Sequence, residues 1–243
     1  MGLKSAIRHL ANRCGYDIQK IDDRFGTLTY PNALARWRKH FPLTFNSVID
    51  VGASDGRWSL HLEKVYPGKH HLLLDANKVH EPALQKLCAT KQNWSYSLCA
   101  VGQAKGSYYF DSSDPLGGHL SETPLGPSYH PCPVSTIDSL TQEFQLPQPY
   151  LIKLDTHGVE IPILEGAASV LVHTDALVVE VYNFESTPPQ VPFWEFCRYI
   201  RQRGFRPLDL WEILHRPADN ALWQFDVLFA RADLPLFKDC RFV

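Results

Sequence analysis

Short apolar runs along the chain alternate with segments in which apolar residues recur with the period of a helix. The runs predict buried strands, and the periodic segments predict helices that cover them. The predicted strands are Val48–Val51, His71–Leu74, Ser95–Val101, Tyr150–Leu154 and Ala176–Val181, and the predicted helices are Trp58–Val65, Glu81–Leu87, Ile137–Phe144, Ile161–Val172 and Phe193–Arg203. This alternation predicts an α/β fold, with a mostly parallel sheet and helices on both faces.

The last part of the chain departs from this alternation. Two strand-like segments, Phe205–Trp211 and Trp223–Ala230, are separated only by a loop. A parallel return needs a longer crossover, so we expect these segments to form an antiparallel pair.

Two helices are expected before the first strand. Residues 3–14 are amphipathic, with Leu3, Ile7, Leu10 and Cys14 on one face. This helix could cover the core, form a dimer interface or contact a membrane surface. A second helix is expected over Asn32–His40. We therefore divide the chain into a helical cap at 1–45, a main domain at 46–232 and a tail at 233–243.

One segment, Ser112–Ser135, is rich in proline and glycine and lies between the third and fourth predicted strands. A connection of this length is usually functional or mobile. It could be a lid over a ligand or a plain surface excursion. His119 is the residue in it that we expect to face a site.

Composition narrows the class of protein. The chain has 24 Lys and Arg against 26 Asp and Glu, and it has no basic tract, so we expect no nucleic-acid partner. Its six cysteines include no C-x-x-C pair, which fits free thiols in a reducing compartment. No run reaches transmembrane length and no signal peptide is evident, so a cytoplasmic location is expected.

The most informative segment is Ser47–Gly56, where an apolar run ends on Asp50 and breaks into a glycine-bounded turn. Such a turn lets the backbone come close to a ligand. A second apolar run ends on Asp75. A carboxylate at the end of the second strand is where a doubly wound domain binds ribose hydroxyls. Together these features predict a nucleoside-like ligand.

The first turn is unsuited to a phosphate. Phosphate-binding fingerprints have closely spaced glycines, whereas Gly52 and Gly56 are separated by Ala53, Ser54 and Asp55. The acidic side chains of the turn would repel a phosphate but suit a cation. S-adenosylmethionine has a sulfonium, an ammonium and a ribose, and it has no phosphate, so we predict this cofactor. The alternative is an ordinary strand-to-helix turn capped by Ser54 or Asp55.

A second turn, within Tyr150–Glu160, repeats the pattern. The apolar strand ends on Asp155, and His157 follows in a glycine-containing turn. A hydroxyl acceptor must lose a proton, and a histidine with a pKa of about 6.5 is suited to remove it. We predict His157 as the base and Asp155 as the group that orients it or faces the cofactor. Helix capping by Asp155, a solvated His157 and a first-turn role for Glu160 are the structural alternatives.

The fifth predicted strand adds Glu180 and Asn183 at the same edge. Glu180 is predicted as a third catalytic residue. Asp155, Glu180 and Asn183 could also hold a divalent metal through oxygen ligands. Acidic residues at adjacent strand ends are common without a metal, so no metal is predicted.

These motifs resemble the FkbM family of S-adenosylmethionine-dependent methyltransferases. The strings that carry the resemblance are V-I-D-V-G-A-S-D-G at 48–56, C-A-V-G at 99–102, L-I-K-L-D-T-H-G-V-E-I-P-I-L-E-G-A at 151–167 and W-Q-F-D-V-L-F at 223–229. The resemblance implies a Rossmann-like class I methyltransferase fold with a seven-stranded sheet. It also makes 46–232 the cofactor-binding domain and implies methyl transfer, usually to an oxygen of a sugar or natural product.

The resemblance also implies positions for the cofactor. Asp50, Gly52 and Ala53 would line its methionine end, Asp75 would hold the ribose with Ala76 and Asn77 beside it, Ala100 and Val101 would lie near the adenine, and Asp155 would lie beside the reacting centre. The chain departs from the family in having Asp75-Ala76 where Glu-Pro is common. His157 stands where Glu or Gln is frequent, so its predicted role as base rests on its chemistry.

Three other functions compete with a small-molecule or glycan O-methyltransferase. A base-methylating enzyme commonly has an Asn/Asp-Pro-Pro-aromatic string, where this chain has Asp155-Thr156-His157-Gly158. A nicotinamide oxidoreductase would need the close-glycine fingerprint. A non-catalytic nucleoside-binding domain would bind the cofactor without turnover. The sequence does not identify the acceptor.

Overall fold

The computed structural model describes residues 28–115, 117–185 and 190–242. The predicted helix over residues 3–14, and with it most of the predicted cap, lies outside these residues. The second expected helix is confirmed as α2 (Tyr30–His40), with Pro31 in its first turn. Proline suits that position because its missing N–H has no intrahelical partner there.

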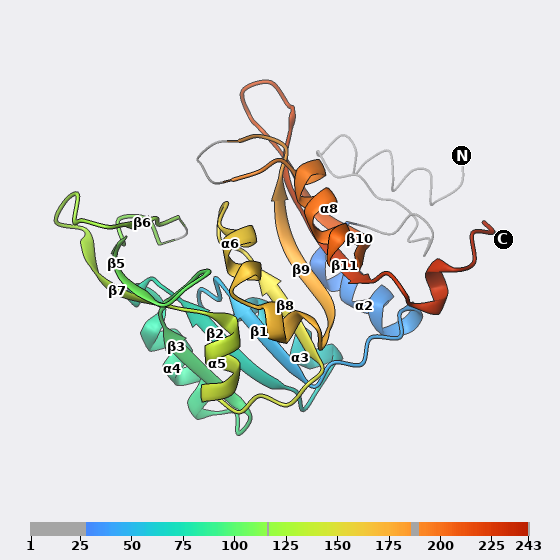
Figure 1. Ribbon diagram of the computed structural model, residues 1–243, viewed down its shortest axis with the longest axis horizontal. Helices are drawn as coiled ribbons and strands as arrows, with labels where there is room; N and C mark the ends of the chain where they lie inside the picture. The colour runs from blue at the N-terminus through green and yellow to red at the C-terminus, as the bar shows by residue number, and fades with distance from the viewer. Residues whose placement is uncertain (1–27, 116, 186–189, 243) are drawn as a thin grey trace, which may run out of the picture.

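The main sheet has seven strands in the order β10-β11-β9-β8-β1-β2-β3. These strands are β1 (Ser47–Val51), β2 (His70–Asp75), β3 (Trp94–Leu98), β8 (Tyr150–Leu154), β9 (Thr174–Tyr182), β10 (Phe205–His215) and β11 (Leu222–Arg231). β3, β2, β1, β8 and β9 are parallel, whereas β11 pairs antiparallel with both β9 and β10. The predicted seven-stranded sheet and its antiparallel strand pair are therefore confirmed (Figure 1).

Helices cover both faces of this sheet, as predicted (Figure 1). On one face α2, α3 (Arg57–Val65) and α4 (Glu81–Ala89) bury apolar side chains that include Trp37, Leu62 and Leu84. On the other face are α5 (Ile137–Glu143), α6 (Glu160–Glu165), α7 (Ala168–Leu171) and α8 (Phe193–Gln202). Burial of these faces supplies the main driving force for folding.

The helix predicted over Ile161–Val172 is divided into α6 and α7 at Gly166. A Cβ at this glycine would lie 2.2 Å from the carbonyl oxygen of Gly102. Glycine at this position therefore allows the close approach of the loop after β4 (Ala100–Val101).

A second, four-stranded sheet corrects two sequence predictions. It has the order β4-β7-β5-β6, with β5 (Gly106–Asp111), β6 (Leu120–Ser121) and β7 (Tyr129–Ser135). The predicted strand Ser95–Val101 is broken at Cys99, so that β4 belongs to this sheet. The segment Ser112–Ser135 is no unstructured loop, because it contains β6 and β7.

The proline content of β7 explains the second error. Pro131 and Pro133 are exposed, whereas Cys132 and Val134 between and after them are buried. The segment is thus an alternating strand in which prolines occupy the outward positions. Proline cannot donate a ladder hydrogen bond, so a sequence rich in it is usually read as a loop.

Two short 3-10 turns complete the described chain, η1 (Lys78–His80) and η2 (Pro235–Phe237). Among the helices of the described residues, none has the length and apolar character needed to cross a membrane. The strand order of the main sheet reverses between β1 and β8. In open α/β sheets ligands bind beside such a reversal, at the carboxyl ends of the strands.

A buried histidine in β2 predicts how stability depends on pH. His71 is fully buried and stacks on Trp94 with ring centroids 4.0 Å apart, and burial lowers its pKa to about 3. Below about pH 6.5 the unfolded chain binds a proton that the folded protein does not. The free energy of unfolding should therefore fall by up to about 2 kcal/mol from this residue between about pH 6.5 and about pH 5.

Urea unfolding of wild type and His71→Phe at both pH values measures this effect. The Phe variant keeps a ring against Trp94 but has no group that titrates, so it should lose less stability on acidification. Equal losses in the two proteins would contradict the prediction.

Candidate functional site

The turn after β1 is pressed against the turn after β8. Gly52 has a φ of 75°, and a Cβ on it would lie 2.0 Å from the carbonyl oxygen of Asp155. Only glycine permits both this left-handed backbone and this approach. The backbone N–H groups of Gly52 and Ala53 donate to the carbonyl of Leu74, which ties the turn to β2 as well. The two motifs found in the sequence therefore form one site.

Asp75 lies at the end of β2, with one carboxylate oxygen directed at this turn and the other at the loop that follows β2. Its Oδ2 accepts from the backbone N–H of Ser54 at 2.7 Å, and its Oδ1 accepts from the N–H of Asn77 at 2.8 Å. Each oxygen has a further lone pair with which to accept a ribose hydroxyl. The structure thus brings the backbone of Ser54 and Asn77 to Asp75, the residue that the sequence predicted for the ribose.

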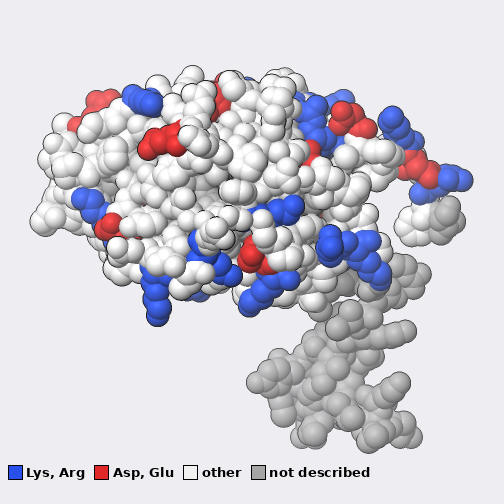
Figure 2. All heavy atoms as spheres, turned by 90° about the horizontal axis from the view of Figure 1, so that it is seen from below, with Lys and Arg blue, Asp and Glu red and all other residues white. Residues whose placement is uncertain are grey.

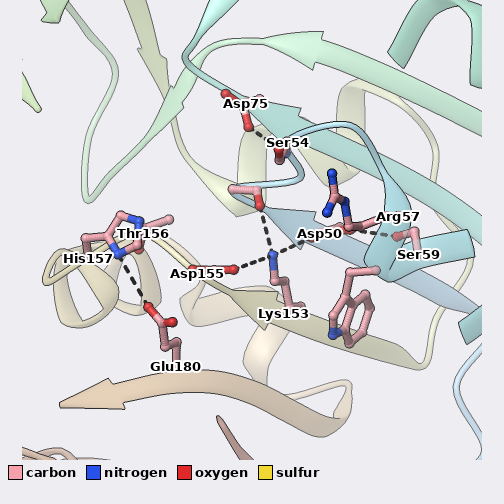
Figure 3. A network of polar contacts seen from close by, with 12 residues as sticks. Asp50, Ser54, Arg57, Ser59, Asp75, Lys153, Asp155, Thr156, His157 and Glu180 are labelled. Carbon is pink, nitrogen blue, oxygen red and sulfur yellow. Dashed lines mark hydrogen bonds and ion pairs between the residues drawn. The ribbon is translucent and has the colours of Figure 1, made fainter. Parts of the chain in front are cut away.

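Lys153 joins the two turns, and the sequence prediction did not include it. Its ammonium donates to the carbonyl of Gly52 at 2.8 Å and lies 3.2 Å from Asp50 Oδ1 and 3.1 Å from Asp155 Oδ2 (Figure 3). Burial alone would lower the pKa of Lys153, but Asp50 and Asp155 raise it above its ordinary value. Lys153 is therefore charged, and the pKa of Asp155 lies below its ordinary value despite burial because Lys153 and His157 favour the carboxylate.

The two acids of the first turn have different surroundings. Asp50 is fully buried, and its Oδ2 accepts from the Ser59 hydroxyl at 2.7 Å. Its carboxylate is therefore enclosed by Ser59 and Lys153 and is not accessible from the surface. Asp55 lies at the surface, where its carboxylate pairs with Arg57 at 2.7 Å.

The small residues predicted to line the cofactor follow the carboxyl ends of β1, β2 and β3. Ala53 is buried at the turn after β1. Ala76 packs against an apolar cluster that includes Ala100 and Val134. Val101 is the second residue of β4 and is buried. Ala76, Ala100 and Val101 thus follow the ends of β2 and β3, as a base beside the ribose would require.

His157 lies in the turn after β8 with a left-handed backbone, at a φ of 57°. Its Nδ1 is 2.6 Å from the Tyr182 hydroxyl. The same nitrogen is 3.3 Å from Glu180 Oε2 (Figure 3). The single hydroxyl proton of Tyr182 is donated to Glu180. Nδ1 must therefore carry the proton that faces Tyr182, so the hydrogen-bond network makes Nε2 the basic nitrogen.

Glu180 is held in place from two sides. Its Oε2 accepts from Tyr182 and its Oε1 accepts from the Gln224 side chain on β11. Burial and the nearby Glu180 raise the pKa of Tyr182, which keeps its hydroxyl protonated. The carboxylate of Glu180, through Tyr182 and its own contact with Nδ1, thus orients the imidazole.

The same side chains have a spacing that a metal ion could use. Ligand atoms of Asp155, His157 and Glu180 lie within 4.8 Å of one another. Lys153, however, already contacts Asp155, and Glu180 accepts on both oxygens. An ammonium beside one ligand opposes a second cation, so these contacts disfavour a metal ion among the three side chains.

Three other polar residues singled out in the sequence lie elsewhere. Glu160 accepts from the Gly158 N–H and the Thr156 hydroxyl, so it holds its own turn. Asn183 donates to the carbonyl of Leu222 and is not part of the cluster with Asp155 and Glu180. His119 contacts Tyr129 within the small sheet.

Besides Lys153, the sequence prediction missed Tyr182, Gln224 and Asp226. Gln224 and Asp226 belong to β11, and the register pairs them with Tyr182 and Glu180 of β9. Their alternation on β11 was the only available signal, and it does not show which residues of β9 they face.

A family model described as the methyltransferase FkbM domain matches residues 50–207. The fold and the site define a class I methyltransferase, whose methyl donor is S-adenosylmethionine. The chain belongs to the FkbM methyltransferase family.

Other comparisons add little. A comparison with curated proteins found no match. Similar solved structures include a precorrin-6y C5,15-methyltransferase from Geobacter metallireducens, with a TM-score of 0.45, 11% identity and coverage of 86% of this chain and 94% of that one. They also include a Burkholderia thailandensis 1,6-didemethyltoxoflavin-N1-methyltransferase, with a TM-score of 0.44, 16% identity and coverage of 83% and 77%.

The residues at the carboxyl edge fit the cofactor of this family. Asp75 would hold the ribose hydroxyls, and the carboxylate of Asp155 would face the cationic end. When bound, S-adenosylmethionine supplies an electrophilic methyl group. The side chains of Lys153 and Asp155 fix the edge against which that group would lie.

Replacing Asp75 tests the ribose site. Asp75→Ala should weaken binding of S-adenosylhomocysteine about tenfold or more, because hydrogen bonds to a charged group contribute about 1.5–3 kcal/mol. Calorimetric titration measures the affinity, and Asp233→Ala, at an exposed carboxylate with a side chain 76% accessible, is the control. An unchanged affinity would remove Asp75 from the cofactor site.

Replacing Lys153 tests the link between the two turns. Lys153→Met leaves the buried carboxylate of Asp50 without its cation and should lower the free energy of unfolding by about 3–5 kcal/mol. The double variant Lys153→Met/Asp50→Asn should recover part of this loss. Urea unfolding measures both, and a single variant within about 1 kcal/mol of wild type would contradict the prediction.

Proposed function

We propose that this methyltransferase transfers the methyl group to a hydroxyl oxygen of a sugar, a glycan or a small natural product. The observation that carries the proposal is the imidazole of His157, oriented by Glu180 and Tyr182 beside Asp155. A hydroxyl is a weak nucleophile until it loses its proton, and a positioned base is the group that methyl transfer to it requires.

The proposed reaction divides the work among residues of this edge. Asp155 and Lys153 fix the cofactor side. The Nε2 atom of His157 accepts the hydroxyl proton, and Glu180 stabilises the imidazolium that results. The side chain of His157 is 44% exposed, so an acceptor can reach it from solvent.

A nucleic-acid acceptor is the main rival within this class of enzyme. The charge of the chain argues against it, since acidic residues slightly outnumber basic ones. On the face shown in Figure 2, Lys and Arg side chains form separate groups among acidic and uncharged residues. Nucleic-acid binding usually needs a continuous basic surface.

The proposal is tested by incubating the protein with methyl-labelled cofactor and fractionated cell extract. We expect label on an oxygen of a small or glycan acceptor, identified by mass spectrometry and the chemical shift of the methyl group. Label on nucleic acid or on nitrogen would overturn the proposal. Asp75→Ala serves as the control that depends on cofactor binding.

The role of His157 has its own test. His157→Ala should lower turnover on the labelled acceptor about 10²-fold or more, while affinity for S-adenosylhomocysteine stays near that of wild type. His173→Ala, at an exposed histidine outside this cluster, is the matched control. Unchanged turnover would place the base elsewhere.

A further inference from the structure

A row of polar side chains crosses the α2 face of the sheet at its carboxyl end. Asp50 on β1 pairs in register with Lys153 on β8, and Asp226 on β11 lies directly opposite Glu180 on β9. Residues directly opposite in an antiparallel pair project from the same face. Leu154 pairs with Val179, so Asp155 comes level with Glu180.

This register places Asp226 on the acceptor side of the site. Neighbouring strands are about 4.8 Å apart. Asp155 after β8, Glu180 on β9 and Asp226 on β11 therefore lie at increasing distance from the turn after β1. Glu180 contacts His157, and Asp226 is one strand beyond it. If an acceptor molecule placed one hydroxyl at His157, the rest of that molecule would lie over Glu180 and Asp226.

Asp226 differs from the other acids of the row in having no donor. Asp50 and Asp155 contact Lys153, and Glu180 accepts from Tyr182 and Gln224. Within the described part of the chain, no group donates a hydrogen bond to the carboxyl group of Asp226 or forms an ion pair with it. A largely enclosed polar group without a partner indicates a ligand group or water that satisfies it.

The surroundings of Asp226 also bear on its charge. Burial, followed by the nearby Asp155 and Glu180, raises the pKa of Asp226 well above its ordinary value. Its register partner Trp211 on β10 is fully buried and closes one side. A protonated carboxyl both donates and accepts, which suits a neutral hydroxyl.

We propose that Asp226 binds a second hydroxyl of the acceptor, so that the acceptor is a neutral ring with several hydroxyls, such as a sugar. This inference rests on the proposed function and adds the acceptor class. The row offers carboxyl groups, and its one lysine is already occupied by Asp50, Asp155 and the Gly52 carbonyl. A phosphorylated or carboxylated acceptor would meet like charge here.

Binding of simple glycosides tests the proposal without turnover. Wild-type protein saturated with S-adenosylhomocysteine is titrated with methyl α-D-glucopyranoside, methyl α-D-galactopyranoside and glucose 6-phosphate, followed by saturation-transfer NMR. We expect at least one neutral glycoside to bind better than the phosphate. Asp226→Leu should weaken that glycoside about five- to tenfold, as expected for one lost hydrogen bond.

Two further variants make the result specific. Asp226→Asn keeps a donor and an acceptor and should bind the glycoside with intermediate affinity, and Asp233→Asn should match wild type. Affinity for S-adenosylhomocysteine and the thermal midpoint show that each variant is folded. Equal glycoside binding by Asp226→Leu and wild type, preference for the phosphate, or no binding of either neutral glycoside would overturn the inference.

Failure of this inference can be told apart from failure of the proposed function. If the labelled methyl appears on oxygen while turnover and glycoside binding are unchanged in Asp226→Leu, only the role of Asp226 is lost. If the label appears on nitrogen or nucleic acid, the proposed function fails and the inference fails with it.

Discussion

The site depends on one buried ammonium, that of Lys153, at the point where the strand order reverses. It neutralises Asp50 at the end of β1, contacts Asp155 in the turn after β8 and donates a hydrogen bond to the Gly52 carbonyl in the turn after β1. Each of these groups would be costly to bury alone. Because the three share one cation, the turns after β1 and β8 keep a fixed separation. A binding site built from two distant segments needs such a constraint.

Backbone geometry makes this arrangement possible. Gly52 adopts a positive φ so that its turn can approach Asp155, and His157 also has a left-handed backbone. The cost of an unusual conformation at a non-glycine residue is about 1–3 kcal/mol and is commonly borne at functional sites. The contact of His157 with Tyr182 and Glu180 from β9 stabilises that conformation.

Much of the fold could be predicted because its signals are local. The parallel strands β1, β2, β8 and β9 each contain an apolar run, and the turns after β1 and β8 each contain an acid and a glycine. The acids Asp50, Asp75 and Asp155 could be placed at one edge because parallel strands end together. The small sheet was missed because the prolines of β7 occupy its outward positions, where the pattern of a strand is hard to recognise.

The partners of the site residues could not be predicted for a different reason. Lys153 was visible as a polar residue inside an apolar strand, but its contacts depend on the register between β1 and β8. Gln224 and Asp226 face β9 only because β11 inserts antiparallel beside it. Such pairings are set by the packing of the whole sheet, and no local pattern encodes them.

The same topology explains why the sequence predicts the identity of the cofactor better than that of the acceptor. The cofactor side is formed by turns that follow parallel strands, and backbone N–H groups of Ser54 and Asn77 fix its key carboxylate. The proposed acceptor side consists of side chains of β9 and β11, whose backbone hydrogen bonds do not depend on side-chain identity. A different side chain at Gln224 or Asp226 would therefore change what the edge recognises while leaving the strand pairing intact. Acceptor specificity can thus vary on a scaffold that keeps its methyl-donor site.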